Sequence, residues 1–220
     1  MSEPYLLMWL EAPLQAWGHD SRFGRRESLD FPTKSGVLGL LCCALGKGGE
    51  QADWLARWAG RDMVVQAYVP QDKQGQPMPR LPMLRDFQMV GSGYVRGAIS
   101  SRDVNHDPWE SLLIPLSADK KNKKTVLTHR YYLQDMAFAV ALQGPQADLE
   151  ELQSALQSPV WDLYLGRKNC VPTELIGQGV HASLEAALER ANQMALDGER
   201  QVKRTAAFRV LQGEHEGSEV

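Results

Sequence analysis

Residues 31–46 read FPTKSGVLGLLCCALG and contain the start, body and end of one helix. Thr33 or Ser35 can cap its first turn, because a short hydroxyl side chain accepts a hydrogen bond from the free N–H groups there. Gly46 can end the helix in the left-handed conformation. Small residues on one side of the helix allow it to pack tightly on a sheet. The stretch therefore predicts a helix that covers a β-sheet.

Apolar runs on either side of this helix predict the strands of that sheet. The run from Tyr5 to Leu10 is typical of a strand covered on both faces, and residues 63–69 and 137–142 predict two more strands. Further helices are expected over residues 50–58, 148–156 and 184–196. The order strand, helix, strand, hairpin, strand, helix, strand predicts an α+β fold, a ferredoxin-like antiparallel sheet with helices on one face.

The pattern is weakest between residues 84 and 128, where glycines, prolines and lysines predict a long hairpin or an irregular insertion. Between Arg80 and Arg130 the chain has nine Lys and Arg residues against five Asp and Glu residues. The whole sequence has 24 basic and 27 acidic side chains, a formal net charge of −3. The insertion is therefore a basic element in an acidic chain.

Composition limits the classes of protein that the chain can belong to. Of its 220 residues, 43% are hydrophobic and 23% are charged, as in ordinary soluble domains. The net charge excludes coating of a nucleic acid by bulk positive charge, so a polyanion site must be a local patch. No apolar stretch approaches the ~18 residues that span a bilayer, so no membrane partner is expected. The three cysteines are too few for a disulfide framework and are expected as reduced thiols of a cytoplasmic protein.

The familiar cofactor and metal motifs do not fit the sequence. Gly91, Gly93 and Gly97 miss the dinucleotide-binding spacing by one position, and Lys47 lacks the frame of a phosphate-binding loop. No Cys/His cluster has the spacing of zinc ligands. We therefore expect no cofactor and no metal.

Three local segments could bind phosphates. Segment 33–35 lies where free N–H groups and the positive end of a helix dipole attract anions, although an ordinary capped helix has the same pattern. Segment 166–169 is a basic turn, and segment 22–26 is a basic loop. Near them, Trp17 and Tyr132 could offer faces on which bases stack.

His129 follows the lysine-rich stretch and could serve a metal-independent ribonuclease. In such a site a base takes the 2′-hydroxyl proton while a cation stabilises the phosphorane. A lone histidine near a strand start is more often structural, so both readings remain open at this point.

Five blocks of the sequence resemble the CasD family, the subunit of the type I-E CRISPR Cascade complex that holds the 5′ handle of the guide RNA (crRNA). The blocks occur in the order and spacing of that family between about residues 5 and 180. They are PLQAWG at 13–18, FPTKSGVLGLL at 31–41, LRDF at 84–87, THRYYLQD at 128–135, and YLGRKNC at 164–170 with PT at 172–173.

The resemblance implies a modified ferredoxin-like, RRM-like fold. Residues 84–128 would form a long thumb β-hairpin within an RNA-binding domain of residues 1–180, and residues 181–220 a C-terminal helix and acidic tail. It also implies a non-catalytic ribonucleoprotein subunit that caps the backbone filament and serves antiviral DNA interference. Its partners would be the crRNA 5′ handle, the Cascade backbone subunit, the large PAM-reading subunit and, through the complex, target DNA. In the related type I-C systems the corresponding subunit is itself the endoribonuclease that processes the crRNA precursor, and this is the competing function.

The RNA contacts predicted from these residues and this resemblance fall into three groups. Segment 33–35 and the basic turn are expected to bind handle phosphates, and thumb arginines to contact the handle–spacer junction. The bases are expected to contact Gln15, Trp17 and Tyr132. The predicted RNA-binding residues are Gln15, Trp17, Arg22, Arg25, Arg26, Thr33, Lys34, Ser35, Gly36, Arg85, Arg96, Arg102, Arg130, Tyr132, Gly166, Arg167 and Lys168.

Overall fold

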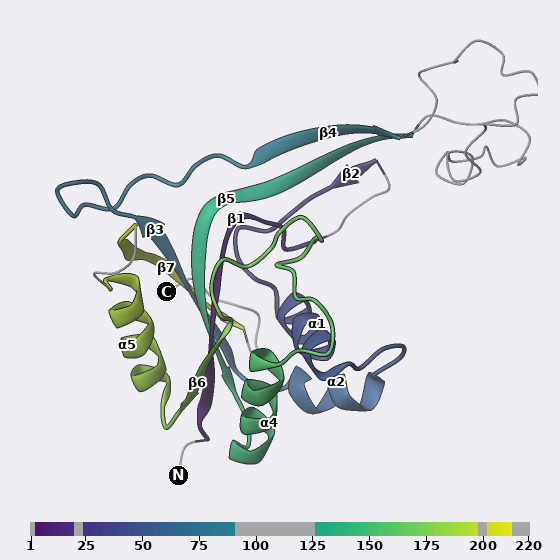
Figure 1. Ribbon diagram of the computed structural model, residues 1–220, viewed down its shortest axis with the longest axis vertical. Coiled ribbons are helices and arrows are strands. Elements are labelled where there is room, and N and C mark those ends of the chain that lie inside the picture. The colour runs from purple at the N-terminus through teal and green to yellow at the C-terminus, as the bar shows by residue number, and fades with distance from the viewer. Residues whose placement is uncertain (1–2, 20–23, 91–125, 198–201, 213–220) are drawn as a thin grey trace, which may run out of the picture.

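A computed structural model describes residues 3–19, 24–90, 126–197 and 202–212 (Figure 1). The predicted contacts Arg22, Arg96 and Arg102 and the acidic tail lie outside these residues. Within the described ranges, no helix is long and apolar enough to cross a membrane. The elements are β1 (Tyr5–Gln15), β2 (Arg25–Arg26), α1 (Lys34–Leu45), α2 (Ala52–Ala59), β3 (Met63–Pro70), β4 (Leu84–Val90), β5 (Val126–Gln143), α4 (Gln146–Gln157), β6 (Gly177–His181), α5 (Leu184–Ala195) and β7 (Arg204–Gln212).

The centre of the fold is an antiparallel sheet with the strand order β6-β1-β5-β3-β7, which confirms the predicted α+β class. β5 has 18 residues and belongs to two structures. Its second half, from Leu133 to Gln143, pairs with β1 in the sheet. Its first half pairs antiparallel with β4 and parallel with β2, and this part extends away from the sheet in Figure 1. We call β2, β4 and residues 126–132 of β5 the ribbon.

Helices cover both faces of the sheet, so the expectation of helices on one face is wrong. Leu6, Met8 and Leu10 of β1 lie in one core with residues of α1, α2 and α4. Leu7 and Trp9 lie in a second core with residues of α5. Figure 1 shows α5 on one side of the sheet and the other helices opposite. Because successive side chains of a strand point to opposite faces, a strand that is apolar at every position needs cover on both.

Helix α1 forms as its sequence predicts. The Thr33 hydroxyl accepts a hydrogen bond from the Gly36 N–H at 3.1 Å, and Gly46 ends the helix with a φ of 68°. The strands predicted near residues 63 and 137 and the three further helices are also present. Two strands were not predicted. β2 lies in the segment predicted as a basic loop, and β7 pairs with β3 where only an acidic tail was expected. β6 takes the place of the last strand in the predicted order, although its two glycines among five residues weaken a strand pattern.

A buried arginine fixes the point at which β5 leaves the sheet. Asp135 has a φ of 48° there, and Pro13, its neighbour on β1, has no N–H to donate to the ladder. The side chain of Arg204, on β7, is 3% exposed. Its guanidinium lies 2.9 Å from a Glu11 carboxylate oxygen and 2.8 Å from an Asp135 carboxylate oxygen. It also donates to the Asp135 carbonyl. This interaction therefore ties β1, β5 and β7 together at the bend.

A glycine turn lies against the end of β1. Gly166 has a φ of 96°, and a Cβ placed on it would lie 1.7 Å from the carbonyl oxygen of Ala16. The Ala16 N–H in turn donates to the Leu165 carbonyl at 3.1 Å. Only glycine fits this position, because both its conformation and its surroundings exclude a side chain.

The substitution Gly166→Ala should lower the free energy of unfolding by about 2–4 kcal/mol, because the new methyl group meets backbone atoms and the residue keeps a positive φ. Gly75→Ala is a matched control. Gly75 has a φ of 79° but no atom within 4 Å of a Cβ, so it should lose only about 1 kcal/mol. Urea unfolding followed by circular dichroism measures both losses. Equal losses would contradict a decisive role for the contact with Ala16.

Candidate nucleic-acid interface

One face of the ribbon brings cationic and aromatic side chains together. The register sets Arg25 beside His129, Arg85 beside Tyr131, and Phe87 beside His129. Side chains of paired residues lie on the same face, so these five share one surface. Its members, which we call the ribbon face, are Arg25, Arg85, Phe87, Met89, Leu127, His129 and Tyr131.

The contacts on the ribbon face bring planar groups close to one another. The Arg25 guanidinium lies 5.3 Å from the centre of the Tyr131 ring, and the Phe87 and His129 rings are 5.2 Å apart. The Nε of Arg85 donates to the Nδ1 of His129 at 3.3 Å. Phe87 is 55% exposed, which leaves a ring available for a further planar partner. Exposed aromatic rings beside arginines are the combination on which single-stranded RNA stacks its bases.

The opposite face of the ribbon holds the next residues along each strand. Arg26 lies beside Arg130, and Arg130 faces Asp86 across the β4–β5 pair. Arg26 is exposed, whereas Arg130 is half-buried. The structure therefore separates the predicted cations, since Arg25 and Arg85 share the ribbon face and Arg26 and Arg130 lie behind it.

The basic turn is held by its own arginine. The Arg167 guanidinium donates to the carbonyls of Tyr131 at 3.0 Å and Arg26 at 2.9 Å, and it lies 4.5 Å from the centre of the Tyr132 ring. Tyr132 is 1% exposed, so its ring is not a free stacking surface. Arg167 and Tyr132 therefore hold the turn against the ribbon, and their contacts with RNA stay predictions. Lys168, the next residue, is exposed.

The start of α1 differs from the predicted phosphate site in one respect. The Lys34 ammonium donates to the carbonyls of Ala59 and Arg61, at the end of α2. Backbone carbonyls at a helix end attract a cation, so Lys34 acts as a C-terminal cap of α2. Its ammonium group is therefore directed to the protein in this structure, and its contact with a handle phosphate stays a prediction.

Gln15 and Trp17 are buried, with 0% and 1% exposure, and do not face solvent. The Gln15 amide donates to the carbonyls of Leu10 and Met136, and its oxygen accepts from the Trp17 indole N–H at 3.1 Å. Side chains whose hydrogen bonds are satisfied inside the protein position their neighbours, and the base contacts of both residues stay predictions.

A groove of about 440 Å³ gathers several predicted residues beside α1. A Cβ on Gly36 would lie 2.9 Å from the Trp17 ring, so the close approach at this glycine is made by the protein itself. Asp162 and Tyr164 also line the groove, and sequence reasoning missed both although they precede the basic turn. The groove, which we call the α1 groove, is lined by Ala16, Trp17, Gly18, Thr33, Ser35, Gly36, Gly39, Leu40, Cys43, Asp162, Tyr164 and Gly166.

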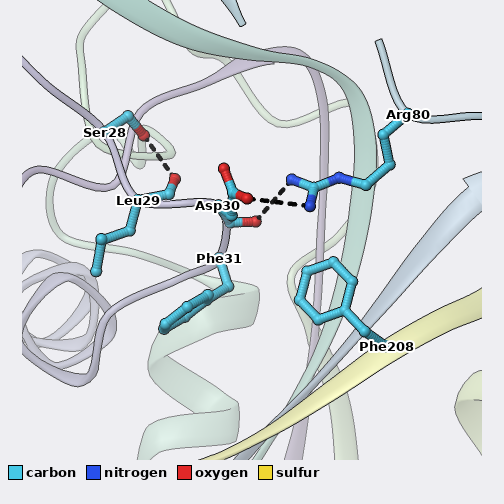
Figure 2. A pocket seen from close by; sticks show the side chains of 6 residues that line it. All are labelled: Ser28, Leu29, Asp30, Phe31, Arg80 and Phe208. Atoms are coloured by element: carbon cyan, nitrogen blue, oxygen red, sulfur yellow. Dashed lines mark hydrogen bonds and ion pairs between the residues drawn. The ribbon is translucent and has the colours of Figure 1, made fainter. Parts of the chain in front are cut away.

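A second, smaller hollow of about 260 Å³ lies between the loop before α1 and β7 (Figure 2). Its Arg80 lies 3.2 Å from a carboxylate oxygen of Asp30 and 5.0 Å from the centre of the Phe208 ring. Figure 2 shows the guanidinium directed at Asp30. This arginine links the loop to the sheet edge and has less to offer a ligand than the ribbon face.

The described residues offer no metal centre, and two of the three thiols are not activated. Within the described ranges no group of three His, Cys, Asp or Glu side chains could hold a metal ion. The three cysteines are free, and burial raises the pKa of the Cys42 and Cys170 thiols. A raised thiol pKa disfavours the thiolate that nucleophilic or metal-binding chemistry needs.

Comparison with known proteins gives the family. The chain is 33% identical over 171 residues to the CRISPR system Cascade subunit CasD of Escherichia coli, an alignment that covers 76% of this chain and 66% of that protein. A solved structure entitled CRISPR RNA-guided surveillance complex matches with a TM-score of 0.57 and 30% identity over 78% of this chain and 61% of the other. A crystal structure of a Cas protein matches with a TM-score of 0.50 and 34% identity, covering 84% and 70%.

The chain thus spans about two thirds of the curated relative, and the resemblance seen in the sequence blocks is confirmed. A family model described as CRISPR-associated protein (Cas_Cas5) matches residues 5–217, which include all five blocks. The chain therefore belongs to the CRISPR-associated protein (Cas_Cas5) family.

Proposed function

We propose that the chain is a non-catalytic subunit of a type I-E Cascade complex that binds the 5′ handle of the crRNA and caps the backbone filament. The ribbon face is the observation that supports this most directly, since it combines Arg25 and Arg85 with exposed aromatic and apolar side chains. Similarity to a Cascade subunit and to a surveillance complex supports the same assignment. The neighbours in the complex would be the backbone subunit, the large PAM-reading subunit and target DNA.

The proposed fold assignment is a modified ferredoxin-like domain. Strands β6, β1, β5 and β3 stand in the order that such a domain uses, with helices in both crossovers. The ribbon would be the base of the thumb, within an RNA-binding unit of residues 1–180. Because the strands of the ribbon are paired with one another, they hold the ribbon face at a fixed orientation to the sheet, as a clamp on one RNA segment requires.

The charges on the ribbon face suit a single strand. Arg25 is paired with Glu27 in an exposed ion pair, which is weak and exchanges readily for a phosphate. Arg85 points its Nε at His129, and a guanidinium has further N–H donors. Lys168 is a third exposed cation, on the turn that Arg167 pins to the ribbon. Phosphate contacts of this kind set register, while the stacked rings contact bases.

The competing function, an endoribonuclease that processes the crRNA precursor, depends on His129. Its Nδ1 accepts from Arg85, so the neutral ring carries its proton on Nε2. Neither nitrogen is then free to take a 2′-hydroxyl proton, which a general base must do. The ring also lies against Phe87 in a tilted pair, with the ring centres 5.2 Å apart. These contacts suit a packing role for His129 better than the role of a general base.

Removing both ribbon-face arginines, Arg25→Ala with Arg85→Ala, should weaken binding of single-stranded handle RNA. It should also reduce the steepness of the salt dependence by about 1.4, because each lost phosphate contact removes roughly 0.7 on a single strand. Filter binding at several salt concentrations measures both. The control pair Arg57→Ala with Arg190→Ala removes exposed cations from α2 and α5, away from the ribbon. The same loss in the control pair, or an unchanged slope in the ribbon pair, would contradict the assignment.

Purified protein incubated with labelled repeat RNA in EDTA should leave the RNA intact. Handle RNA should still be retained by the same preparation, which shows that the protein is active in binding. Cleavage at the base of the handle that is lost in His129→Ala would overturn the non-catalytic assignment and establish the nuclease.

Arg167→Lys should lower the free energy of unfolding by about 1–2 kcal/mol, because lysine keeps the charge but cannot reach two carbonyls and stack on Tyr132 together. The salt dependence of RNA binding by this variant should equal that of the wild-type protein. The neighbouring Lys168→Ala should do the reverse, with wild-type stability and a slope reduced by about 0.7. Thermal melts and salt titrations of the two variants separate the structural role of Arg167 from the RNA-binding role of Lys168. An Arg167→Lys protein as stable as wild type would contradict the structural role of Arg167.

A further inference from the structure

The α1 groove has the wrong charge for a phosphate. Among the described residues that line it, Asp162 is the only charged side chain. The two nearby cations of the predicted phosphate sites are directed elsewhere, Lys34 to the end of α2 and Arg167 to the ribbon carbonyls. A carboxylate repels phosphate and attracts hydrogen-bond donors. The groove therefore suits a ligand group with an uncharged, donor-rich edge.

The floor of the groove is open to a flat group. Gly39 is in the interior of α1, where glycine costs about 1 kcal/mol relative to alanine. No atom of the described residues lies within 4 Å of a Cβ built on it, so no packing contact among them requires the glycine. Gly36 differs, because the Trp17 ring fills the space above it. The volume of about 440 Å³ is within the range of small-ligand pockets, roughly 300–1,000 Å³.

The walls supply stacking and hydrogen bonds. Tyr164 is half-buried and lines the groove, and its hydroxyl lies 3.4 Å from an Asp162 carboxylate oxygen, which it orients. Thr33 and Ser35 add hydroxyl groups that both donate and accept. An aromatic wall with a carboxylate beside it matches a nucleobase whose edge presents two adjacent N–H donors. Guanine has such an edge in its N1–H and N2–H₂ groups, whereas uracil flanks its one N–H with acceptors that a carboxylate repels.

We propose that the α1 groove is a base-specificity site that takes one unpaired guanine of the bound RNA. Asp162 accepts from its N1–H and N2–H₂ groups, and Tyr164 provides the stacking wall. This inference rests on the proposed RNA-binding function and assigns specificity to two residues outside the ribbon face. The ribbon face holds the strand, and the α1 groove reads one base of it.

The test compares heptauridine with the same RNA carrying one central guanosine, adenosine, cytidine or inosine. Wild-type protein should bind the guanosine RNA about tenfold more tightly than heptauridine, with inosine weaker because it lacks the 2-amino group. Asp162→Asn should abolish the preference and leave heptauridine binding unchanged. Gly39→Leu should also abolish it by filling the groove, with an undiminished melting temperature, since leucine favours a helix over glycine. Asp53→Asn, an exposed acid on α2, is the matched charge control and should behave as wild type.

Three outcomes would overturn the guanine site. Wild-type protein that binds every RNA equally overturns it while leaving the proposed RNA binding intact, as does a preference that survives Asp162→Asn. An equal gain for all RNAs in Asp162→Asn shows only general repulsion and also overturns it. If no RNA binds, the proposed function fails, and saturation-transfer NMR with free guanosine decides the site. Transfer to guanosine in wild type but not in Asp162→Asn supports it, and no transfer in wild type overturns it.

Discussion

The contact of Arg204 with Glu11 and Asp135 is the constraint on which the arrangement of this protein depends. It lies where β5 stops being a strand of the central sheet and becomes the middle strand of the ribbon. Arg204 and Glu11 are largely buried, so the loss of either destabilises the bend, whereas Asp135 is 51% exposed and its share of the contact is screened by solvent. The orientation of the ribbon face relative to the sheet therefore rests on one arginine from the last strand.

Short-range features of this fold could be predicted from the sequence, because their causes lie within a few residues. The Thr33 cap, the Gly46 end and the buried strand at residue 5 are of this kind. Features with distant causes could not. Gln15 bonds to Met136, Lys34 to Arg61 and Arg167 to Tyr131, and no local pattern reveals those partners. Local patterns therefore pointed to these segments but could not reveal that several of their side chains are bonded to distant parts of the protein.

Five of the described cations illustrate two different roles. Lys34, Arg167 and Arg204 are bound to carbonyls or carboxylates of the protein and hold elements together. Arg25 and Arg85 stand among exposed rings on the ribbon face. An acidic chain can thus present a basic surface, because only the cations that the fold does not use are left for a polyanion. The sequence held a sign of this basic surface, because alternation along one strand places Arg85 and Phe87 on the same side.

The position of β1 in the sheet has a consequence for folding during synthesis on the ribosome. β1 pairs with β5 and β6, whose residues follow it by more than a hundred positions, so its ladder cannot close until most of the chain has been synthesised. Contacts of such long range slow folding, and the apolar run at residues 5–10 stays uncovered on a ribosome during that time. A nascent chain with this topology can aggregate until β5 and β6 have been synthesised and pair with β1. It is therefore a natural client for chaperones that shield extended apolar segments.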